Sequence, residues 1–566
     1  MPLAAYRGSA RLVPGLVPVM LPSSAASHVA VVGAGPAGIV VALELARRGC
    51  RVTLVESGGS KPDAATQRLG DAALIDPRAH VPMALATCRR IGGASNLWGG
   101  RCVPYDPIDF DARPWIGDAP WPITFDEMAR YHQRACDWFQ IGSATFSSHA
   151  IPTMRQKGIV PGLPDEDVLT SSLERWSLPT NFRLEYGRAL ASTPGLRLES
   201  GLTCVEVMLD STGQRVSGLR CRRRGGGEDS LVVADRYVIA CGGLESTRLL
   251  LASRSVLPGG LGNGSGLLGR CYMGHVSGKI AEAVFSTPPD KTQYAYSRVD
   301  GGVYVRQRFS FSRDTLMRER LPNIVGWLVN PEIAKAEHGS GVLSFAYLAL
   351  SSPLLGKRFI AEGIRQAAIG AGPRVVWPHV ANMIHDLPAT AAFIPTFAWK
   401  RFCVRRKVPG FFVKSGANRY PLQYHAEHLP HAESRVWLTD DCDELGMPRL
   451  AIDIRIGAAD VAGVLRAHEL WDAHLRRHGC GRLEMKENPQ DFIVEQFHEG
   501  YHQSGTTRMS AEHGAGVVDP NLKVHDVDNL YVASGSVLVT SSQANTTFPV
   551  VALAIRLADH LLESVS

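Results

Sequence analysis

The stretch HVAVVGAGPAGIVVALELARRGCRVTLVESGG, residues 28–59, limits the possible folds of this chain more than any other. Residues 29–32 form a short apolar run typical of a buried strand, residues 36–48 have the periodicity of a helix, and residues 51–55 are again typical of a strand. A helix between two such strands indicates a βαβ unit, which requires a parallel sheet. The sequence therefore predicts an α/β fold.

The turn between the first strand and the helix has the glycine pattern of a dinucleotide site. Gly33, Gly35 and Gly38 have the spacing G-x-G-x-x-G. The first permits a tight turn, the second lets backbone N–H groups approach a pyrophosphate, and the third lets the helix pack closely on the strand. Glu56 ends the second strand, where an acid can accept hydrogen bonds from the ribose hydroxyls. The pattern predicts dinucleotide binding, and FAD and NAD fit it equally well.

Three later segments predict the rest of the same domain. Residues 203–222 alternate like a hairpin around Gly213, residues 236–253 indicate a strand, a Gly-Gly turn and a helix, and residues 529–564 indicate a strand, a loop and a long amphipathic helix. Because these segments come from both halves of the chain, we expect the middle of the chain to be inserted into this domain.

The overall composition is that of a large soluble protein. A chain of 566 residues exceeds the usual size of one hydrophobic core, so we expect two or more domains. The formal net charge of +6 is small, and no basic stripe is interleaved with aromatics, so we expect no nucleic acid partner. Eleven scattered cysteines without a C-x-x-C pair indicate a reducing cytoplasm rather than disulfides or a zinc site.

Residues 1–26 are predicted to be a disordered leader. They contain two arginines and small residues near their end, as secretion signals do, but Pro14, Pro18 and Pro22 interrupt the apolar stretch. Export therefore stays an alternative to a cytoplasmic location.

The glycine-rich unit and four further segments resemble the glucose-methanol-choline (GMC) oxidoreductases, FAD enzymes that oxidise alcohols and sugars. The further segments are RRIGGASNLWGGRCVP (89–104), GLLGRCYMGH (266–275), ESRVWLTDDCDELGMPRLAIDIRI (433–456) and the tail from Tyr501. The tail is the most specific, because HQSGTTRM, GVVDPNLKVHDVDNLYVASGSV and QANTTFPVVALAIRLADHL follow the family's closing order. The chain is most similar to the pyranose-oxidase and fructose-dehydrogenase-like branch, in which the second active-site position is Asn.

The resemblance implies a discontinuous Rossmann-like FAD-binding domain with an inserted α+β substrate-binding domain of GMC type. The predicted boundaries assign residues 27–110, 190–275 and 500–566 to the FAD-binding domain and residues 111–189 and 276–499 to the substrate-binding domain.

The resemblance also implies that His502 and Asn545 are the two catalytic residues. Without that context, a lone histidine is more often structural than chemical. Hydride transfer from a carbinol to flavin N5 leaves a hydroxyl proton to be removed, and an imidazole is well matched to that task. Asn545 can donate a hydrogen bond to the same oxygen. Thr546 and Thr547 precede Phe548 and Pro549, which predicts a helix start. The resemblance implies that this helix end points at the flavin, where its dipole would stabilise the reduced ring by about 1 kcal/mol.

The motif and the resemblance together predict a set of cofactor-contacting residues. They are Gly33, Gly35, Pro36, Ala37, Gly38, Glu56, Gly93, Asn96, Trp98, Gly99, Val205, Gly242, Gly535, Ser536 and Thr546. In pyranose oxidase a histidine attached covalently to the flavin occupies the position that is Leu97 here, so we expect non-covalent FAD. Many relatives have Asp where this chain has Ser534, which removes one charge near the cofactor.

The sequence HAEHLPH contains His425, His428 and His431 and superficially suggests a metal site. In a strand, however, His425 and His431 would lie about 20 Å apart on one face while His428 points to the other. The resemblance places this segment in the sheet of the substrate-binding domain, so we expect no metal there.

Residues 353–413 differ most from the family. Residues 391–412 mix aromatics with lysines and arginines and are not strongly periodic. We interpret the segment as an insertion with a solvated basic face; the alternative is a peripheral membrane contact through 393–413, or an anionic or lipid-linked substrate.

The sequence thus predicts an FAD-dependent oxidoreductase that oxidises the CH–OH group of a secondary alcohol, of a sugar or glycosylated compound, to a ketone. Oxygen, a quinone or a cytochrome all stay open as the electron acceptor. The alternatives are a lyase of the same fold without net redox and a flavin-binding protein without catalysis.

Overall fold

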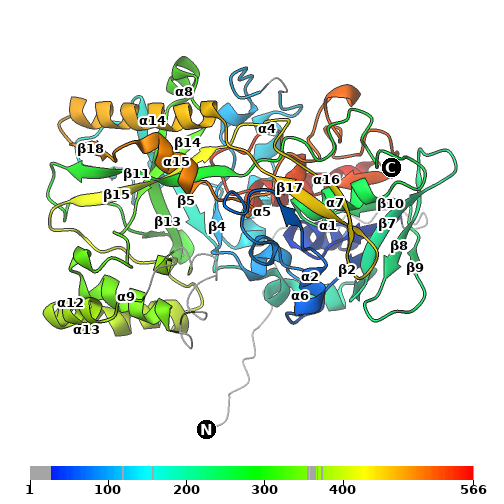
Figure 1. Cartoon of the computed structure of the whole chain (residues 1–566), viewed down its shortest axis with the longest axis horizontal. Coiled ribbons are helices and arrows are strands. Elements are labelled where there is room, and N and C mark those ends of the chain that lie inside the picture. The colour runs from blue at the N-terminus through cyan, green and yellow to red at the C-terminus, as the bar shows by residue number, and fades with distance from the viewer. Residues whose placement is uncertain are drawn as a thin grey trace, which may run out of the picture.

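The structure is a computed structural model that describes residues 27–117, 120–155, 158–352, 356, 365, 368–370 and 374–564. The leader predicted at residues 1–26 lies outside the described residues, as does most of 353–373. Figure 1 shows two adjoining parts, each built around a sheet, with the C-terminus in the part on the right.

The part on the right is built on a parallel sheet of five strands in the order β19-β10-β1-β2-β6. Its strands are β1 (His28–Val32), β2 (Arg51–Glu56), β6 (Leu196–Ser200), β10 (Arg236–Ile239) and β19 (Leu530–Val532). Helix α1 (Pro36–Ala46) packs against α16 (Thr547–Glu563), and both are almost entirely buried or half-buried. The predicted βαβ unit and α/β class are confirmed, although the helix ends two residues before the predicted Arg48.

The same part contains the predicted hairpin and the predicted strand-turn-helix. Strands β7 (Thr203–Leu209) and β8 (Val216–Arg222) pair antiparallel around Gly213, and β9 (Ser230–Val232) joins them as a third strand. Helix α7 (Gly243–Ala252) follows β10 after a Gly-Gly turn. The nucleotide-binding part is therefore discontinuous in sequence, as predicted.

The part on the left is built on an eight-stranded sheet. Seven strands follow the order β18-β11-β15-β14-β13-β5-β4, and β12 pairs with β13. The strands are β4 (Arg101–Cys102), β5 (Val168–Trp176), β11 (His275–Phe285), β12 (Ser297–Val299), β13 (Val303–Phe311), β14 (Ile324–Leu328), β15 (Arg419–Glu427) and β18 (Gly481–Met485). The strand β4 falls within the range 27–110 yet pairs with β5, and the domain boundaries themselves stay a prediction.

Helix α14 (Ala458–Arg477) lies along one face of this sheet, where Figure 1 shows it across the upper left. Its Trp471 stacks on Phe311 at 5.2 Å between ring centroids, and its His468 lies against Tyr424. Helix α15 (Pro489–Gln496) packs on β11. An antiparallel sheet commonly buries one face in a core and leaves the other face polar. Since α14 covers one face of this sheet, we expect polar residues on the other.

Short elements complete the described fold. A small sheet joins β3 (Ala73–Leu74), β16 (Arg435–Cys442) and β17 (Pro448–Asp453). The shorter helices are α2 (Ala64–Arg68), α3 (Met83–Ala86), α4 (Phe125–Ala129), α5 (His132–Phe139), α6 (Phe182–Ser192) and α8 (Arg313–Glu319).

The predicted insertion is helical where the structure describes it. Helices α9 (Gly341–Ser351), α12 (Trp377–His385) and α13 (Leu387–Ala398) pack on one another, and a π turn (Trp399–Cys403) follows α13. Figure 1 shows these helices at the lower left, beneath the eight-stranded sheet. Within the described residues, no helix combines the length and the apolar character needed to cross a membrane.

Candidate active site

The glycine-rich loop lines a cavity at the carboxyl ends of β1 and β10. Gly33 has a φ of +101°, and a Cβ there would lie 2.5 Å from the carbonyl oxygen of Ala240. At Gly38, a Cβ would lie 1.9 Å from the carbonyl oxygen of Gly33. These two contacts explain physically why glycine is required at each position, since the turn and the helix have no space for a side chain.

The carboxylate of Glu56 is buried at the end of β2 and lines the same cavity. It accepts hydrogen bonds from the N–H of Ala34 at 2.8 Å and from the N–H of Gly58 at 2.9 Å. Burial raises the pKa of Glu56, while these two N–H groups and Arg89 act in the opposite direction. Glu56 therefore fixes the loop and still presents acceptor capacity to the cavity, as adenosine ribose recognition requires.

Nine of the fifteen predicted cofactor residues line this cavity: Gly33, Gly35, Pro36, Ala37, Glu56, Gly93, Gly242, Gly535 and Thr546. The sequence did not single out several other lining residues, among them Arg89, Thr203, Cys204, Glu245 and Gln503. Arg89 donates to Glu245 at 2.5 Å and to the Ser57 hydroxyl at 3.1 Å, so this pair borders the nucleotide end of the cavity. Arg89 and Glu245 are 156 residues apart in sequence, so no local pattern predicts their pairing.

The other six predicted residues are not in the cavity lining. Asn96 donates to the carbonyls of Ile91 and Gly93 and so fixes the turn that carries Gly93, while Trp98 donates to the carbonyl of Thr180. Ser536 accepts from the Thr507 hydroxyl at 2.6 Å. Gly38 packs the helix on the loop, Gly99 is exposed, and Val205 is buried next to the lining residue Cys204. Asn96 and Gly38 thus fix parts of the cavity wall, whereas the exposed Gly99 does not.

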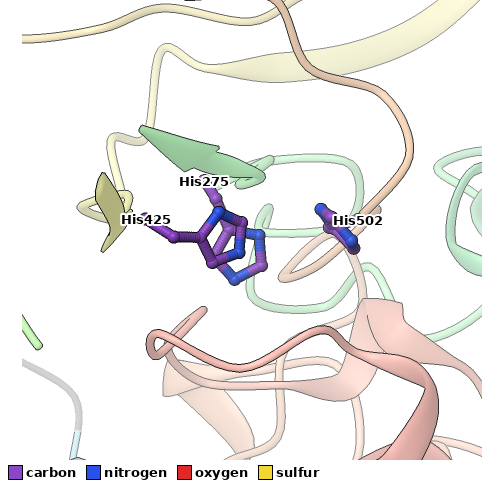
Figure 2. Close-up of side chains that lie close together, drawn as sticks. All are labelled: His275, His425 and His502. Carbon is purple, nitrogen blue, oxygen red and sulfur yellow. The ribbon is translucent and has the colours of Figure 1, made fainter. Parts of the chain in front are cut away.

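His502 lies where the cavity meets the eight-stranded sheet. Its chain neighbours Tyr501 and Gln503 line the cavity, and its ring lies edge-to-face on His275 at 4.6 Å between centroids. Figure 2 shows His502 facing the rings of His275 and His425. The histidine thus occupies the junction between the two parts of the molecule.

Glu499 orients the His502 ring. Its Oε1 accepts from His502 Nδ1 at 2.7 Å, and its Oε2 accepts from the N–H groups of Gly500, Tyr501 and His502 at 2.7, 3.0 and 3.3 Å. Burial alone would raise the pKa of Glu499, but the hydrogen-bonded ring of His502 and the nearby ring of His275 hold it well below its usual value. A carboxylate that stays ionised keeps the proton on Nδ1 and leaves the lone pair on Nε2.

Asn545 completes the pair. Its Nδ2 lies 2.6 Å from His502 Nε2 although 43 residues separate the two in sequence. It directly precedes Thr546, the cap of helix α16, so the predicted helix start lies next to the histidine. Its Oδ1 is buried and has no hydrogen-bond partner in the described part of the chain. The ring nitrogen and the amide group are therefore in direct contact, and a hydroxyl that binds both has to replace their mutual hydrogen bond.

His275 and His425 stack at 4.2 Å between centroids with an angle of 21° between their rings. His275 Nε2 donates to the carbonyl of Ser541 at 3.2 Å, and His425 Nδ1 pairs with the Ser277 hydroxyl at 2.5 Å. Burial lowers the pKa of His275 to about 4 and that of His425 well below its usual value. Both rings are therefore neutral at physiological pH.

The three imidazoles are close enough to raise the question of a metal, since one nitrogen of each lies within 4.8 Å of the others. Stacked rings direct their lone pairs along parallel planes rather than to one point, and both nitrogens of His502 already have partners. The geometry favours hydrogen bonding over metal ligation. His425 lies in β15, as predicted, but His428 and His431 lie beyond the strand end and contact Arg455 and Asp460 instead.

Comparisons with known proteins find oxidoreductase families along the segments that form this site. Residues 184–268 and 430–554 match the GMC oxidoreductase family, and residues 27–73 match the pyridine nucleotide-disulphide oxidoreductases. The chain is 23% identical to paromamine 6'-oxidase of Streptomyces fradiae over 94% of this chain and 90% of that protein. It is 24% identical to the fructose dehydrogenase large subunit of Gluconobacter japonicus over 59% of this chain and 48% of that protein.

Among solved structures, the chain is similar to pyridoxine 4-oxidase from Mesorbium loti. The TM-score is 0.53 at 18% identity, and the match covers 95% of this chain and 99% of that one. Two chains that superpose over nearly their whole lengths at such low identity share a fold.

Proposed function

The chain belongs to the GMC oxidoreductase family, and from this premise we propose that it is an FAD-dependent enzyme that oxidises a secondary alcohol, of a sugar or glycosylated compound, to a ketone. The observation that carries the proposal is the His502–Asn545 pair, held by Glu499 beside a cavity with the dinucleotide motif. FAD, when bound along the glycine-rich loop, supplies the hydride acceptor.

The residues divide the remaining chemistry between them. A donor hydroxyl would replace the direct contact between His502 and Asn545, donating to Nε2 of the histidine and accepting from Nδ2 of the asparagine. When His502 takes the hydroxyl proton, its ring becomes an imidazolium, and the Glu499 carboxylate stabilises that charge through the Nδ1 proton. Asn545 stabilises the negative charge that builds on the donor oxygen.

We propose that FAD is held without a covalent bond. Leu97, at the position where pyranose oxidase has its flavin-linked histidine, has no nucleophilic atom and is 37% exposed. Acid precipitation of the purified protein should release intact yellow FAD into the supernatant. Flavin fluorescence that stays with the polypeptide on a denaturing gel would contradict this proposal.

The proposal includes a peripheral contact with an anionic membrane surface through 393–413, extended by α12. In this region Phe393, Phe397 and Phe411 pack on one another, whereas Trp399 and Trp377 are 63% and 80% exposed. The exposed Lys400 follows Trp399 directly in sequence, and the exposed Arg405 and Lys407 come a few residues later. Exposed tryptophans beside cations are the composition of segments that lie in a membrane interface.

Vesicle sedimentation tests this contact. The full chain should sediment with phosphatidylglycerol vesicles and much less with phosphatidylcholine vesicles, and Trp377→Ser with Trp399→Ser should abolish the binding. Leu184→Ser serves as the matched control, because Leu184 is 68% exposed on helix α6. Equal sedimentation of the double variant would overturn the contact. If the membrane contact is overturned in this way, we propose a cytoplasmic enzyme without a membrane partner, with which the eleven free cysteines agree.

A donor panel tests the function itself. Sugars, glycosides and simple secondary alcohols are supplied with an artificial electron acceptor, and the product is identified as a ketone. The physiological acceptor, whether oxygen, a quinone or a cytochrome, is then sought by replacing the artificial one. A product that forms without any acceptor would indicate a lyase of the same fold.

A further inference from the structure

The face of the eight-stranded sheet beneath His502 is unusually polar. In antiparallel pairs, residues directly opposite each other share a face. Ser277 lies opposite His425, Arg306 opposite Glu174, and Arg101 opposite Trp176. Together with the alternation along each strand, these pairs place the following residues on one face, here called the polar face: Arg101, Glu174, His275, Ser277, Arg306, Arg308, Trp327 and His425.

The opposite face of the same strands packs against helix α14 through mostly apolar residues. There Gly326 lies opposite Phe309, and a Cβ on Gly326 would meet the ring of Trp471 at 3.1 Å. Phe309 and Tyr424 are almost fully buried in the apolar core under α14. On that side apolar residues satisfy the packing, and the buried Arg175 and Gln307 donate to backbone carbonyls, so the shared carboxylate of the polar face calls for a different explanation.

The charges on the polar face do not balance. Arg101 and Arg306 share the carboxylate of Glu174, so two guanidinium groups face one acid. Arg308 donates to uncharged oxygens, the Oε1 of Gln543 at 2.6 Å and the Oγ of Ser172 at 2.8 Å. Burial lowers the pKa of Arg308 to about 10, which still leaves it protonated near neutral pH. With its two histidines neutral, these residues carry three positive charges and one negative charge, and Glu427, which lies opposite His275, is already paired with Arg113.

Among the buried polar atoms of this face that lack a hydrogen-bond partner within the described residues are Nη2 of Arg101, Nε of Arg308, Nδ1 of His275 and Nε2 of His425. The groups connect to the catalytic histidine through aromatic contacts: Arg101 lies 4.6 Å from the Trp327 ring centroid, Trp327 6.3 Å from His425, and His425 5.7 Å from His502. A buried donor that has no partner is costly unless a ligand supplies one.

We propose that the polar face binds the donor molecule and selects alcohols that carry an anionic group, a carboxylate or a phosphate, over neutral and cationic alcohols. The inference rests on the proposed function and specifies its substrate class. The anionic group accepts from Arg101, a second hydroxyl pairs with His425, Trp327 packs against the body of the donor, and the reacting hydroxyl lies at His502.

Calorimetric titration of the FAD-loaded enzyme with four related compounds tests the selection. Glucose is the neutral parent, glucuronate and glucose 6-phosphate add one anionic group of each kind, and glucosamine adds a cation. One of the two acids should bind about 10- to 100-fold more tightly than glucose, the gain typical of a charge-assisted hydrogen bond, and glucosamine should bind most weakly. Which acid binds more tightly distinguishes the carboxylate from the phosphate.

Two variants assign the preference to the polar face. Arg101→Gln should reduce the affinity for the acid about 10- to 100-fold and leave glucose unchanged. His425→Gln should weaken both compounds alike, since it removes a hydroxyl partner and no charge. Arg476→Gln is the matched control, because Arg476 lies on helix α14 at the other side of the sheet, with its side chain 55% exposed, and should change nothing.

The outcomes separate this inference from the proposed function. Glucose or glucosamine binding as tightly as the acids, or an Arg101→Gln variant with unchanged acid affinity, would overturn the inference. An equal loss for all four compounds together with a shifted flavin reduction potential would also overturn it, since Arg101 would then serve the flavin. Acids that bind through Arg101 but never bleach the flavin anaerobically would leave the inference standing and refute the proposed function.

Discussion

The two sheets of this molecule differ in how they use their faces. The parallel sheet is apolar throughout its centre, and β1 and β2 are buried along most of their lengths. The eight-stranded sheet is apolar only beneath α14, while its other face carries Arg101, Glu174 and Arg306. The first sheet fixes the glycine-rich loop, and the second carries the face that we propose as the binding surface. Buried arginines elsewhere, such as Arg113 and Arg248, each have an acid as partner, whereas on the second sheet two arginines share one acid.

This difference also explains what the sequence could predict. The glycine turn, the hairpin around Gly213 and the start of helix α16 are local patterns, and the structure contains all three. The polar face is not local, because it depends on the register between strands that are far apart in the chain. No periodicity in a single sequence fixes such a register.

In the candidate site too, local sequence patterns could be predicted and contacts between distant segments could not. The structure brings His502 and Asn545 together, and their catalytic roles stay a proposal. Glu499 was missed although it lies only three residues before His502, because an acid followed by Gly-Tyr-His is no recognised pattern. His275 and His425 were missed as partners of His502 since they reach it from two different strands.

The largest expected effect is that of His502→Ala. Loss of a positioned general base should lower the rate of flavin reduction by about 10²–10⁴ while FAD stays bound, since His502 does not itself line the nucleotide cavity. Rapid mixing of enzyme and donor without oxygen measures this rate. A rate equal to that of the unmodified chain would make the histidine structural.

Glu499→Gln should reduce the same rate by about 100- to 1000-fold. The amide keeps the shape of the side chain but removes the charge that stabilises the imidazolium and fixes the Nδ1 proton. Glu495→Gln is the matched control, because Glu495 is exposed on the neighbouring helix α15. Comparable losses in the two variants would show that Glu499 has no special role.

Asn545→Ala should cost on the order of 10- to 1000-fold in flavin reduction, because it removes one hydrogen-bond donor and leaves the base in place. Asn545→His should recover part of the loss, since a protonated ring nitrogen can donate to the same oxygen. The test compares single-turnover rates of the three proteins with one donor. An alanine variant slower than His502→Ala would reverse the assigned roles.

In the parallel sheet, Gly38→Ala should destabilise the fold by about 1–3 kcal/mol and weaken FAD binding, because the added methyl group collides with the carbonyl of Gly33. Gly187→Ala in helix α6 meets no atom within 4 Å and should instead stabilise by about 1 kcal/mol. Urea denaturation of both variants measures the difference. Equal stability would mean that the loop can relax away from the contact.

The smallest effect concerns acid stability on the polar face. Burial lowers the pKa of His275 from 6.5 to about 4, with His502 and Arg101 lowering it further and Glu499 opposing. The unfolded chain takes up this proton near pH 6.5 and the folded chain only near pH 4, so its stabilising contribution is complete above pH 6.5 and is lost as pH falls toward 4. In urea titrations across this window, His275→Asn should lose less stability than the unmodified chain. An equal loss of unfolding free energy in the variant and the unmodified chain would contradict the assignment of this pH dependence to His275.

The most direct test of the central claim is a single anaerobic turnover of the FAD-loaded enzyme with its best donor from the panel. The account predicts that the flavin bleaches and that one equivalent of ketone forms for each flavin reduced, since the alcohol loses two electrons and has no other acceptor. Product without bleaching would mean a reaction without net redox. Neither bleaching nor product with any donor would mean that the arrangement of His502, Asn545 and Glu499 does not oxidise alcohols.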